Sequence, residues 1–531
     1  MNSLDADALA ERLKGEMRDY WLHIEADSPL EKYPAKHHAQ RVAERLNVDN
    51  GLIYLPGMPT ILLPDSDQPQ PFRQLRYFYY LSGVNEPDCH ITYDISRDIL
   101  TLWIPEITPR QVIWFGRGST IAEAFEKYDV DDVGYSSEVD QFLGDWLKES
   151  TGKIYTLHQY CQTSSRHDST SLKPAMDACR VIKTPDEINL IKRANEITAH
   201  AHKAVLSNIS SFRNETEVEA VFLDACISEG AKHQAYKIIA ASGENASTLH
   251  YVKNDEPLEG RQLMCLDAGC EWHCYASDVT RTFPFSDSWP SAEGKNIYDL
   301  VSEIQRVCIA NLKPGVRFFD VHILAHRKVI SGLKQLGIFH NGTDLEIFMA
   351  GTSLAFFPHG LGHHVGLEVH DVSDVPLMAM DVQCGIPVYK PDMCKSPVHP
   401  SSGALREGMV VTVEPGIYFS RYALSTVYLP SPIHSKYINK DVLVKYLPVG
   451  GVRIEDDILI TANGHENLTT APKGDEMLQI IRSGMKNGFN GKERVMASGN
   501  RPRRSIPDFE LLPHPTNQQS RTFSQIFNLP Q

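Results

Sequence analysis

Four carboxylates stand in or beside segments whose apolar residues predict buried strands. They are Asp267, Asp278, Glu414 and Glu455. Burying a carboxylate is costly unless a cation or hydrogen bonds replace its lost hydration. A fold that accepts all four therefore needs positive charge at the place where these strands meet.

The two aspartates flank a predicted hairpin. The chain between Asp267 and Asp278 is expected to turn near Trp272 and His273, which makes the aspartates cross-strand partners on one face. Like charges that close together repel unless a cation or a proton lies between them. Taken alone, the pair fits two unrelated strand ends at least as well, so the interpretation depends on the other motifs.

A segment rich in histidine and glycine follows. Four histidines lie within twelve positions, among them His359, His363 and His370. His359 and His363 have the spacing of a helical zinc pair, but Gly360 and Gly362 disfavour a helix. The glycines instead indicate backbone packed tightly around a site, and several histidines together favour a functional role.

The four carboxylates and the imidazole of His363 form a plausible set of metal ligands. Such an oxygen-rich set suits hard or borderline divalent ions such as manganese, and cobalt or zinc less decisively. Four negative charges can be balanced by two divalent cations, so two metal ions per chain are expected. Strand alternation also places Arg453 on the same face as Glu455.

The chain is expected to have two domains and a tail, because 531 residues exceed one ordinary core. Residues 1–180 are predicted to be mixed α/β, with a hairpin of strands at 91–95 and 99–104 and another strand at 111–115. Residues 181–473 form the second domain. Residues 474–531, apart from a short helix at 475–482, are expected to be a disordered tail.

The second domain contains a weak internal repeat. One helix is predicted to start after Thr184, with Pro185 and Glu187 completing its capping signals, and another starts at Asn214. Strands follow to about residue 285. Helices at 297–311 and 319–336, and strands at 409–419 and 452–460, repeat this order. The fold class is therefore α+β, with a pseudo-twofold domain and a site between its halves.

Composition excludes several classes of function. A net charge of −15 argues against nucleic-acid binding, which needs a basic face. No apolar stretch could span a bilayer, and the first 27 residues lack the apolar core of a secretory signal. A cytoplasmic protein without a membrane partner is expected. Cys265, Cys270 and Cys274 lack the spacing of a zinc knuckle and are predicted to be small buried residues.

These motifs resemble the Xaa-Pro aminopeptidase and prolidase family of pita-bread metallopeptidases. The matching motifs are Leu-Asp-Ala-Gly, Ser-Asp-Val-Thr-Arg-Thr, His-Gly-Leu-Gly-His, Val-Glu-Pro-Gly-Ile-Tyr and Gly-Val-Arg-Ile-Glu-Asp, preceded by a similar segment from Ser242 to Tyr251. Residues 72–83 resemble, more weakly, the family's N-terminal domain, which shapes the substrate entrance and dimer contacts. The resemblance implies peptide substrates with proline in second position and allows for a homodimer.

The resemblance also implies a role for each residue. Asp267 would bind one metal ion, His363 and Glu414 the other, and Asp278 and Glu455 both. A hydroxide between the ions would attack the scissile carbonyl, with Glu414 moving the proton. The residues expected to line the pocket and position substrate are His250, His359, His370 and Arg453.

The expected activity is that of an Xaa-Pro aminopeptidase, which hydrolyses the bond between any N-terminal residue and a penultimate proline. The alternative is an Xaa-Pro dipeptidase (prolidase). Eukaryotic prolidases usually have an arginine-rich stretch that holds the dipeptide carboxylate, whereas residues 395–403 contain no arginine and Arg406 lies just beyond. This difference favours the aminopeptidase.

More distant alternatives are less consistent with the sequence. A catalytically inactive binding relative would have lost metal ligands, yet all five are present. A methionine aminopeptidase would lack the large N-terminal domain. Creatinase-like amidinohydrolases would lack the metal-binding set.

Overall fold

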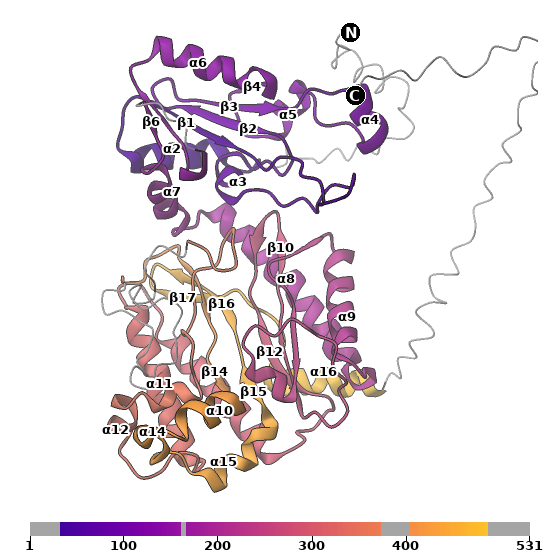
Figure 1. Cartoon of the computed structure of the whole chain (residues 1–531), viewed down its shortest axis with the longest axis vertical. Coiled ribbons are helices and arrows are strands. Elements are labelled where there is room, and N and C mark those ends of the chain that lie inside the picture. The colour runs from indigo at the N-terminus through magenta and orange to yellow at the C-terminus, as the bar shows by residue number, and fades with distance from the viewer. Residues whose placement is uncertain (1–31, 161–165, 373–376, 378–402, 487–531) are drawn as a thin grey trace, which may run out of the picture. The chain divides into compact units, whose positions relative to one another are not determined.

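The computed structural model describes residues 32–160, 166–372, 377 and 403–486 of the chain. These residues form a mixed α/β N-terminal domain followed by a larger α+β domain, drawn in purple and in magenta to yellow in Figure 1. None of the helices in these residues combines the length and apolar character needed to cross a bilayer. Residues 1–31 and 395–402, on which two of the predictions depend, lie outside the described residues.

The N-terminal domain is built on one six-stranded sheet with the order β4-β3-β2-β1-β5-β6. Its strands are β1 (Gly51–Pro56), β2 (His90–Asp94), β3 (Ile99–Ile104), β4 (Asp132–Tyr135), β5 (Lys153–Tyr155) and β6 (His167–Asp168). The predicted hairpin is confirmed, because β2 and β3 pair antiparallel with Thr92 opposite Thr101. Besides α4 (Pro109–Phe115), which is described below, the α-helices of this domain are α2 (Ala35–Leu46), α3 (Arg76–Ser82), α5 (Ile121–Lys127), α6 (Val139–Glu149) and α7 (Leu172–Arg180).

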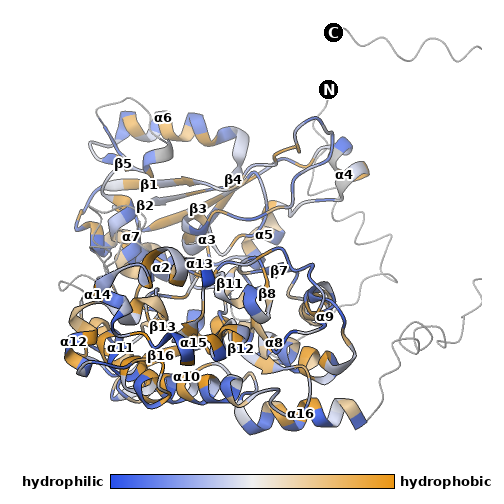
Figure 2. Cartoon of the chain, turned by 60° about the horizontal axis from the view of Figure 1, so that its bottom comes forward, coloured by the Kyte–Doolittle hydropathy of each residue, from blue (hydrophilic) through white to orange (hydrophobic). Residues whose placement is uncertain are grey.

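Helix α6 shows why these segments fold as they do. Val139, Leu143 and Trp146 recur at helical spacing and are buried. Figure 2 shows the resulting alternation of hydrophilic and hydrophobic residues along this helix. One face therefore packs on the domain while the other meets water.

The strand predicted at residues 111–115 is wrong, because this segment lies in helix α4 (Pro109–Phe115). The amide of Val112 donates to the carbonyl of Thr108 at 3.1 Å, which is a helical hydrogen bond. Ile113 and Trp114 are 79% and 71% exposed, so no sheet buries this apolar run. A short apolar run does not distinguish a strand from a helix by its periodicity.

The second domain follows the predicted repeat of helix pair, strands, helix pair and strands. Its first half contains α8 (Pro185–Asn208), α9 (Glu215–Ser228), β7 (His233–Gln234), β8 (Ile239–Ser242), β9 (Leu263–Asp267), β10 (Cys270–Trp272), β11 (Tyr275–Ala276) and β12 (Thr280–Pro284). Capping boxes begin both helices, at Thr184 and at Asn214, as predicted. Cys265, Cys270 and Cys274 are free and buried, which also confirms the prediction.

The second half of this domain positions two of the carboxylates at breaks in strands. Its elements are α10 (Ala292–Ala310), α11 (Phe318–Gln335), α12 (Asp344–Met349), β13 (Val410–Val413), β14 (Gly416–Tyr418), α15 (Lys440–Tyr446), β15 (Gly451–Arg453), β16 (Asp456–Thr461) and β17 (Gly464–Asn467). Strand β13 pairs with β16, and β14 pairs with β15. Glu414 and Glu455 lie in the two interruptions between these pairs. A ligand atom of each of these two carboxylates lies within 4.8 Å of the other.

The predicted pairing of Asp267 with Asp278 needs correction. Strands β9 and β12 pair with Asp267 opposite Thr280. The turn of the hairpin lies at His273 and Cys274, whose φ angles are 47° and 66°, one residue later than predicted. Moving the turn by one residue moves every cross-strand partner by two, so Asp278 is a diagonal neighbour of Asp267. A shift of two keeps both aspartates on one face.

Helix α16 (Gly474–Lys486) corrects the predicted boundary at residue 473. Met477 and Ile481 are buried in the same hydrophobic core as α8 and α9. A Cβ atom at Gly484 would lie 2.0 Å from the carbonyl oxygen of Ser207, so α16 approaches α8 closely there (Figure 1). The packed domain therefore extends to Lys486, and the rest of the predicted tail, residues 487–531, lies outside the described residues.

The close approach of α16 to Ser207 predicts that replacing glycine by alanine has opposite effects on stability in α16 and in α6. Gly484→Ala should lower the free energy of unfolding by about 1–3 kcal/mol, because its methyl group overpacks the contact with Ser207. Gly144→Ala in α6 is the control, since nothing lies within 4 Å of a Cβ there. That change should leave stability unchanged or raise it by up to about 1 kcal/mol. Denaturant titration of both variants measures the difference, and equal effects would contradict the packing of α16.

Candidate metal centre

The predicted donor side chains converge from strand ends and loops in the second domain. Three overlapping groups of ligand atoms each lie within 4.8 Å: Asp267, Asp278 and Glu455; His363, Glu414 and Glu455; and Asp278, His363 and His370. Shared members link the three groups into one cluster. Residues separated by nearly two hundred positions in the sequence are thus brought together.

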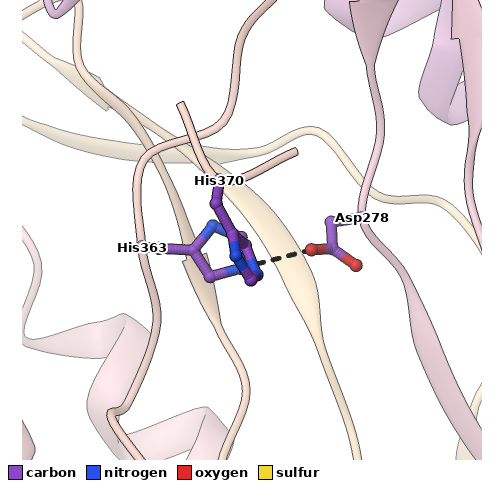
Figure 3. Close-up of side chains that lie close together, drawn as sticks. All are labelled: Asp278, His363 and His370. Carbon is purple, nitrogen blue, oxygen red and sulfur yellow. Dashed lines mark ion pairs between the residues drawn. The ribbon is translucent and has the colours of Figure 1, made fainter. Parts of the chain in front are cut away.

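His363 is oriented by the backbone carbonyl of the next residue. Its Nδ1 lies 3.0 Å from the carbonyl oxygen of His364, so Nδ1–H donates and Nε2 faces the carboxylates. Nε2 lies 3.3 Å from Oδ2 of Asp278 and 3.4 Å from Oε1 of Glu414. Figure 3 shows His363 pointing toward Asp278, with the ring of His370 4.2 Å away. This is the tautomer that presents a lone pair to a metal ion.

Both oxygens of Asp267 are held by hydrogen bonds. The hydroxyl of Tyr236 donates to Oδ1 at 2.6 Å, and Nη2 of Arg453 donates to Oδ2 at 2.7 Å. The other nitrogens of Arg453 donate to Tyr418 at 2.8 Å and to Thr280 at 3.1 Å. Arg453 is therefore fully engaged inside the protein and fixes the orientation of Asp267.

Glu455 shows that the cluster requires additional positive charge. It is 1% exposed and accepts a 2.6 Å hydrogen bond from the hydroxyl of Thr280. Burial, followed by repulsion from Asp278 and Glu414, raises its pKa well above the ordinary value. Divalent cations would remove this repulsion, and the carboxylate and imidazole donors suit such ions. The residues present therefore fit the metal centre that the sequence predicts.

Glu414 has an environment suited to proton transfer. Burial raises the pKa of Glu414, the positive charge of His363 lowers it, and the negative charge of Asp278 raises it again. The resulting pKa is about 7. The hydroxyl of Thr412 donates to its Oε1 at 3.3 Å. Bound cations would lower this pKa again and leave an ionised carboxylate that is able to accept a proton.

His359 is held in a neutral form beside the cluster. Burial, followed by the charge of Arg453, lowers its pKa to about 3. Its Nδ1 lies 2.7 Å from the carbonyl oxygen of Gly360, and its Nε2 lies 2.8 Å from the hydroxyl of Tyr418. A neutral ring must donate from Nδ1 to the carbonyl and accept at Nε2 from Tyr418. The arrangement also leaves Tyr418 free to accept from Arg453.

All nine side chains predicted for the site line one cavity of about 260 Å³. They are His250, Asp267, Asp278, His359, His363, His370, Glu414, Arg453 and Glu455. Sequence reasoning missed the other lining residues, which are Tyr236, Lys237, Ile239, Leu249, Val252 and Val369. Proximity alone does not test the role predicted for each of the nine.

Asp457 is a further residue that sequence reasoning missed. Its Oδ2 accepts from the backbone amide of Asp278 at 3.0 Å and from Nδ2 of Asn195 at 2.8 Å. Burial, followed by the negative charge of Asp278, raises its pKa to about 8. Its place in the run Glu455-Asp-Asp was the available signal. Asp457 holds the backbone that carries Asp278.

Family models match both domains of the chain. The model described as metallopeptidase family M24 matches residues 189–462, and the model described as the aminopeptidase P N-terminal domain matches residues 35–155. Aminopeptidase P from Escherichia coli with the inhibitor Pro-Leu is similar in structure, with a TM-score of 0.70, 28% identity and coverage of 86% of this chain and 100% of that one. Aminopeptidase PepP of Pseudomonas aeruginosa matches with the same values.

Fungal relatives are more similar in sequence. A protein of Pyrenophora teres f. teres named "Probable Xaa-Pro aminopeptidase" is 58% identical over 507 residues, which are 91% of this chain and 54% of that protein. An Aspergillus clavatus protein with the same description is 54% identical over 88% of this chain and 96% of its own length. The chain thus spans about half of the first relative and nearly all of the second. With both family models matched in order, the chain belongs to metallopeptidase family M24 and carries the aminopeptidase P N-terminal domain.

Proposed function

We propose that this protein is an Xaa-Pro aminopeptidase that removes the N-terminal residue from peptides with proline in second position. The observation that carries the proposal is the convergence of four carboxylates and His363 in one cavity. The names of the fungal relatives and of the bacterial structures support the choice of substrate. The intact donor set argues against an inactive binding relative.

The proposed cofactors are two divalent ions, with manganese as the first choice. Asp267, Asp278, His363, Glu414 and Glu455 would hold them. The chemistry that such ions supply is polarisation of the scissile carbonyl and a lower pKa for a water molecule. A zinc-substituted Escherichia coli aminopeptidase P in complex with product is among the similar structures, at a TM-score of 0.67.

The protein's own groups would move the proton and orient the reacting atoms. We assign proton transfer to Glu414, because its carboxylate lines the cavity and its Oε1 lies 3.4 Å from Nε2 of His363. His250 and His370 line the cavity with exposed rings that are able to contact a peptide. Arg453 and His359 also line the cavity, where their hydrogen bonds orient Asp267 and Tyr418.

One observation favours the dipeptidase alternative. Lys237 lines the same cavity, is exposed, and has no ion pair with the described residues. Its ammonium group would be able to receive the free carboxylate of an Xaa-Pro dipeptide. Arg406 is exposed and is not among the described residues that line the cavity. The homodimer and the cytoplasmic location stay predictions.

Metal dependence is the first expected outcome. Purified protein should contain two divalent ions per chain, and a chelator should abolish peptidase activity that manganese then restores. The physical reason is that the buried carboxylates repel one another without cations. Elemental analysis and activity assays measure this. Trace metal together with activity that is indifferent to chelator would contradict it.

Glu414→Gln should lower kcat by at least about 100-fold, because the amide keeps the shape of the side chain but loses its charge and its proton. Glu407→Gln is the control, since Glu407 is an exposed carboxylate on the same stretch of chain. The control should retain normal kcat, and both variants should keep their circular dichroism spectra. Near-normal turnover of Glu414→Gln with full metal content would show that the proton is carried elsewhere.

Peptide length separates the two family activities. Xaa-Pro-Xaa tripeptides should be cleaved with kcat/KM at least equal to that of matching Xaa-Pro dipeptides, measured with manganese present. Lys237→Met provides the matched variant, because it removes the ammonium but keeps the length of the side chain. A strong preference for dipeptides that Lys237→Met abolishes would establish the dipeptidase instead.

A further inference from the structure

Two of the site histidines lie on one irregular segment, residues 363–371, which we call the His370 segment. It contains no helix, and its internal backbone hydrogen bonds join Asp371 to His364 at 2.9 Å and Gly366 to Glu368 at 3.1 Å. Such a segment has little regular structure to hold a side chain in place. Its position must depend on contacts with its surroundings.

The N-terminal domain holds Glu368, two residues before His370. Arg73 donates to both carboxylate oxygens of Glu368, at 3.0 and 2.9 Å, and Nε of Arg76 donates at 3.2 Å. Both arginines also contact Glu271 of strand β10. Burial raises the pKa of Glu368, but the hydrogen bonds and charge of Arg73 bring that pKa below its ordinary value.

A second ionic contact holds Asp371, the residue after His370. Nη2 of Arg180, at the end of α7, donates to Oδ1 at 2.5 Å, and Nζ of Lys183 donates to Oδ2 at 3.1 Å. All three side chains are at most 3% exposed. A Cβ atom at Gly366 would lie 2.4 Å from Oδ2 of Asp371, so the segment closes tightly on this carboxylate.

We propose that Arg73, Arg76 and Arg180 position His370 from the N-terminal domain, acting through Glu368 and Asp371. The inference rests on the proposed function, in which His370 contacts substrate. A bidentate or buried ion pair fixes both the distance of a carboxylate from its cation and the orientation of the two groups, whereas an apolar contact does not fix orientation. Because both anchored residues lie within two positions of His370, displacement of either one moves its ring. The three arginines are therefore positioning residues rather than catalytic residues.

A purely structural role would join the two domains without affecting His370. The surroundings of Glu368 allow the two roles to be separated. Glu368→Gln removes one charge, while Arg73 and Arg76 each keep their contact with Glu271. No buried arginine is left without an ionic partner, so the variant should fold and melt near the wild-type temperature.

The expected effect of Glu368→Gln is a loss of kcat on the order of ten-fold, with unchanged metal content, because His370 loses its fixed orientation. Glu229→Gln is the matched control. Glu229 is 28% exposed, compared with 35% for Glu368, and it accepts from Arg193 and His200 away from the cavity. The control variant should keep its full kcat.

A double-mutant cycle with His370→Ala tests the route of the effect. If Glu368 acts through His370, adding Glu368→Gln to His370→Ala should change kcat by less than about two-fold. The same loss in both backgrounds, or no loss from Glu368→Gln alone, would overturn the proposal. Failure of the proposed function gives a different result, namely no hydrolysis of Xaa-Pro peptides by the wild-type protein with manganese.

Discussion

The mutual repulsion of four carboxylates, of which three are buried and Glu414 is half-buried, is the constraint on which the rest of this structure depends. Strands β13 and β16, and strands β14 and β15, are interrupted where Glu414 and Glu455 turn toward the cavity. Arg453 offsets one negative charge through Asp267, while burial, followed by the remaining negative charges, raises the pKa of Glu455 well above its ordinary value. A pseudo-repeat of helices and strands can hold such a cluster only if cations or protons offset the repulsion between the carboxylates.

The hydrogen bonds around the cluster fix orientation before any substrate arrives. His363 is oriented by the carbonyl of His364, and Asp267 by Tyr236 and Arg453. The backbone amide of Asp278 donates a hydrogen bond to Asp457, which fixes the chain that carries Asp278. The carbonyl and the tyrosine hydroxyl among these partners are neutral, and each guanidinium nitrogen of Arg453 already makes a hydrogen bond. The N-terminal domain adds ionic contacts to the segment that carries His370. These contacts join the N-terminal domain to the segment that carries His370, whereas the described residues that line the cavity all belong to the second domain.

Much of the site was predictable because its signals are local. Carboxylates in apolar strands and the capping box at Thr184 are visible over a few residues. The register of Asp267 was not predictable, because one residue in the position of a turn decides it. A short helix at 475–482 was predicted, but its packing on the domain was not, because that packing depends on a close approach to Ser207. The contact of Arg73 with Glu368 was not predictable because it spans nearly three hundred positions.

Anomalous diffraction from crystals grown with manganese tests the central claim most directly. We expect two peaks within the cluster, one beside Asp267 and the other beside His363 and Glu414, with Asp278 and Glu455 next to both. Two divalent cations at these places would offset the negative charge of the four carboxylates and so explain how the cluster stays within the protein. A single peak, or peaks away from these side chains, would contradict the account.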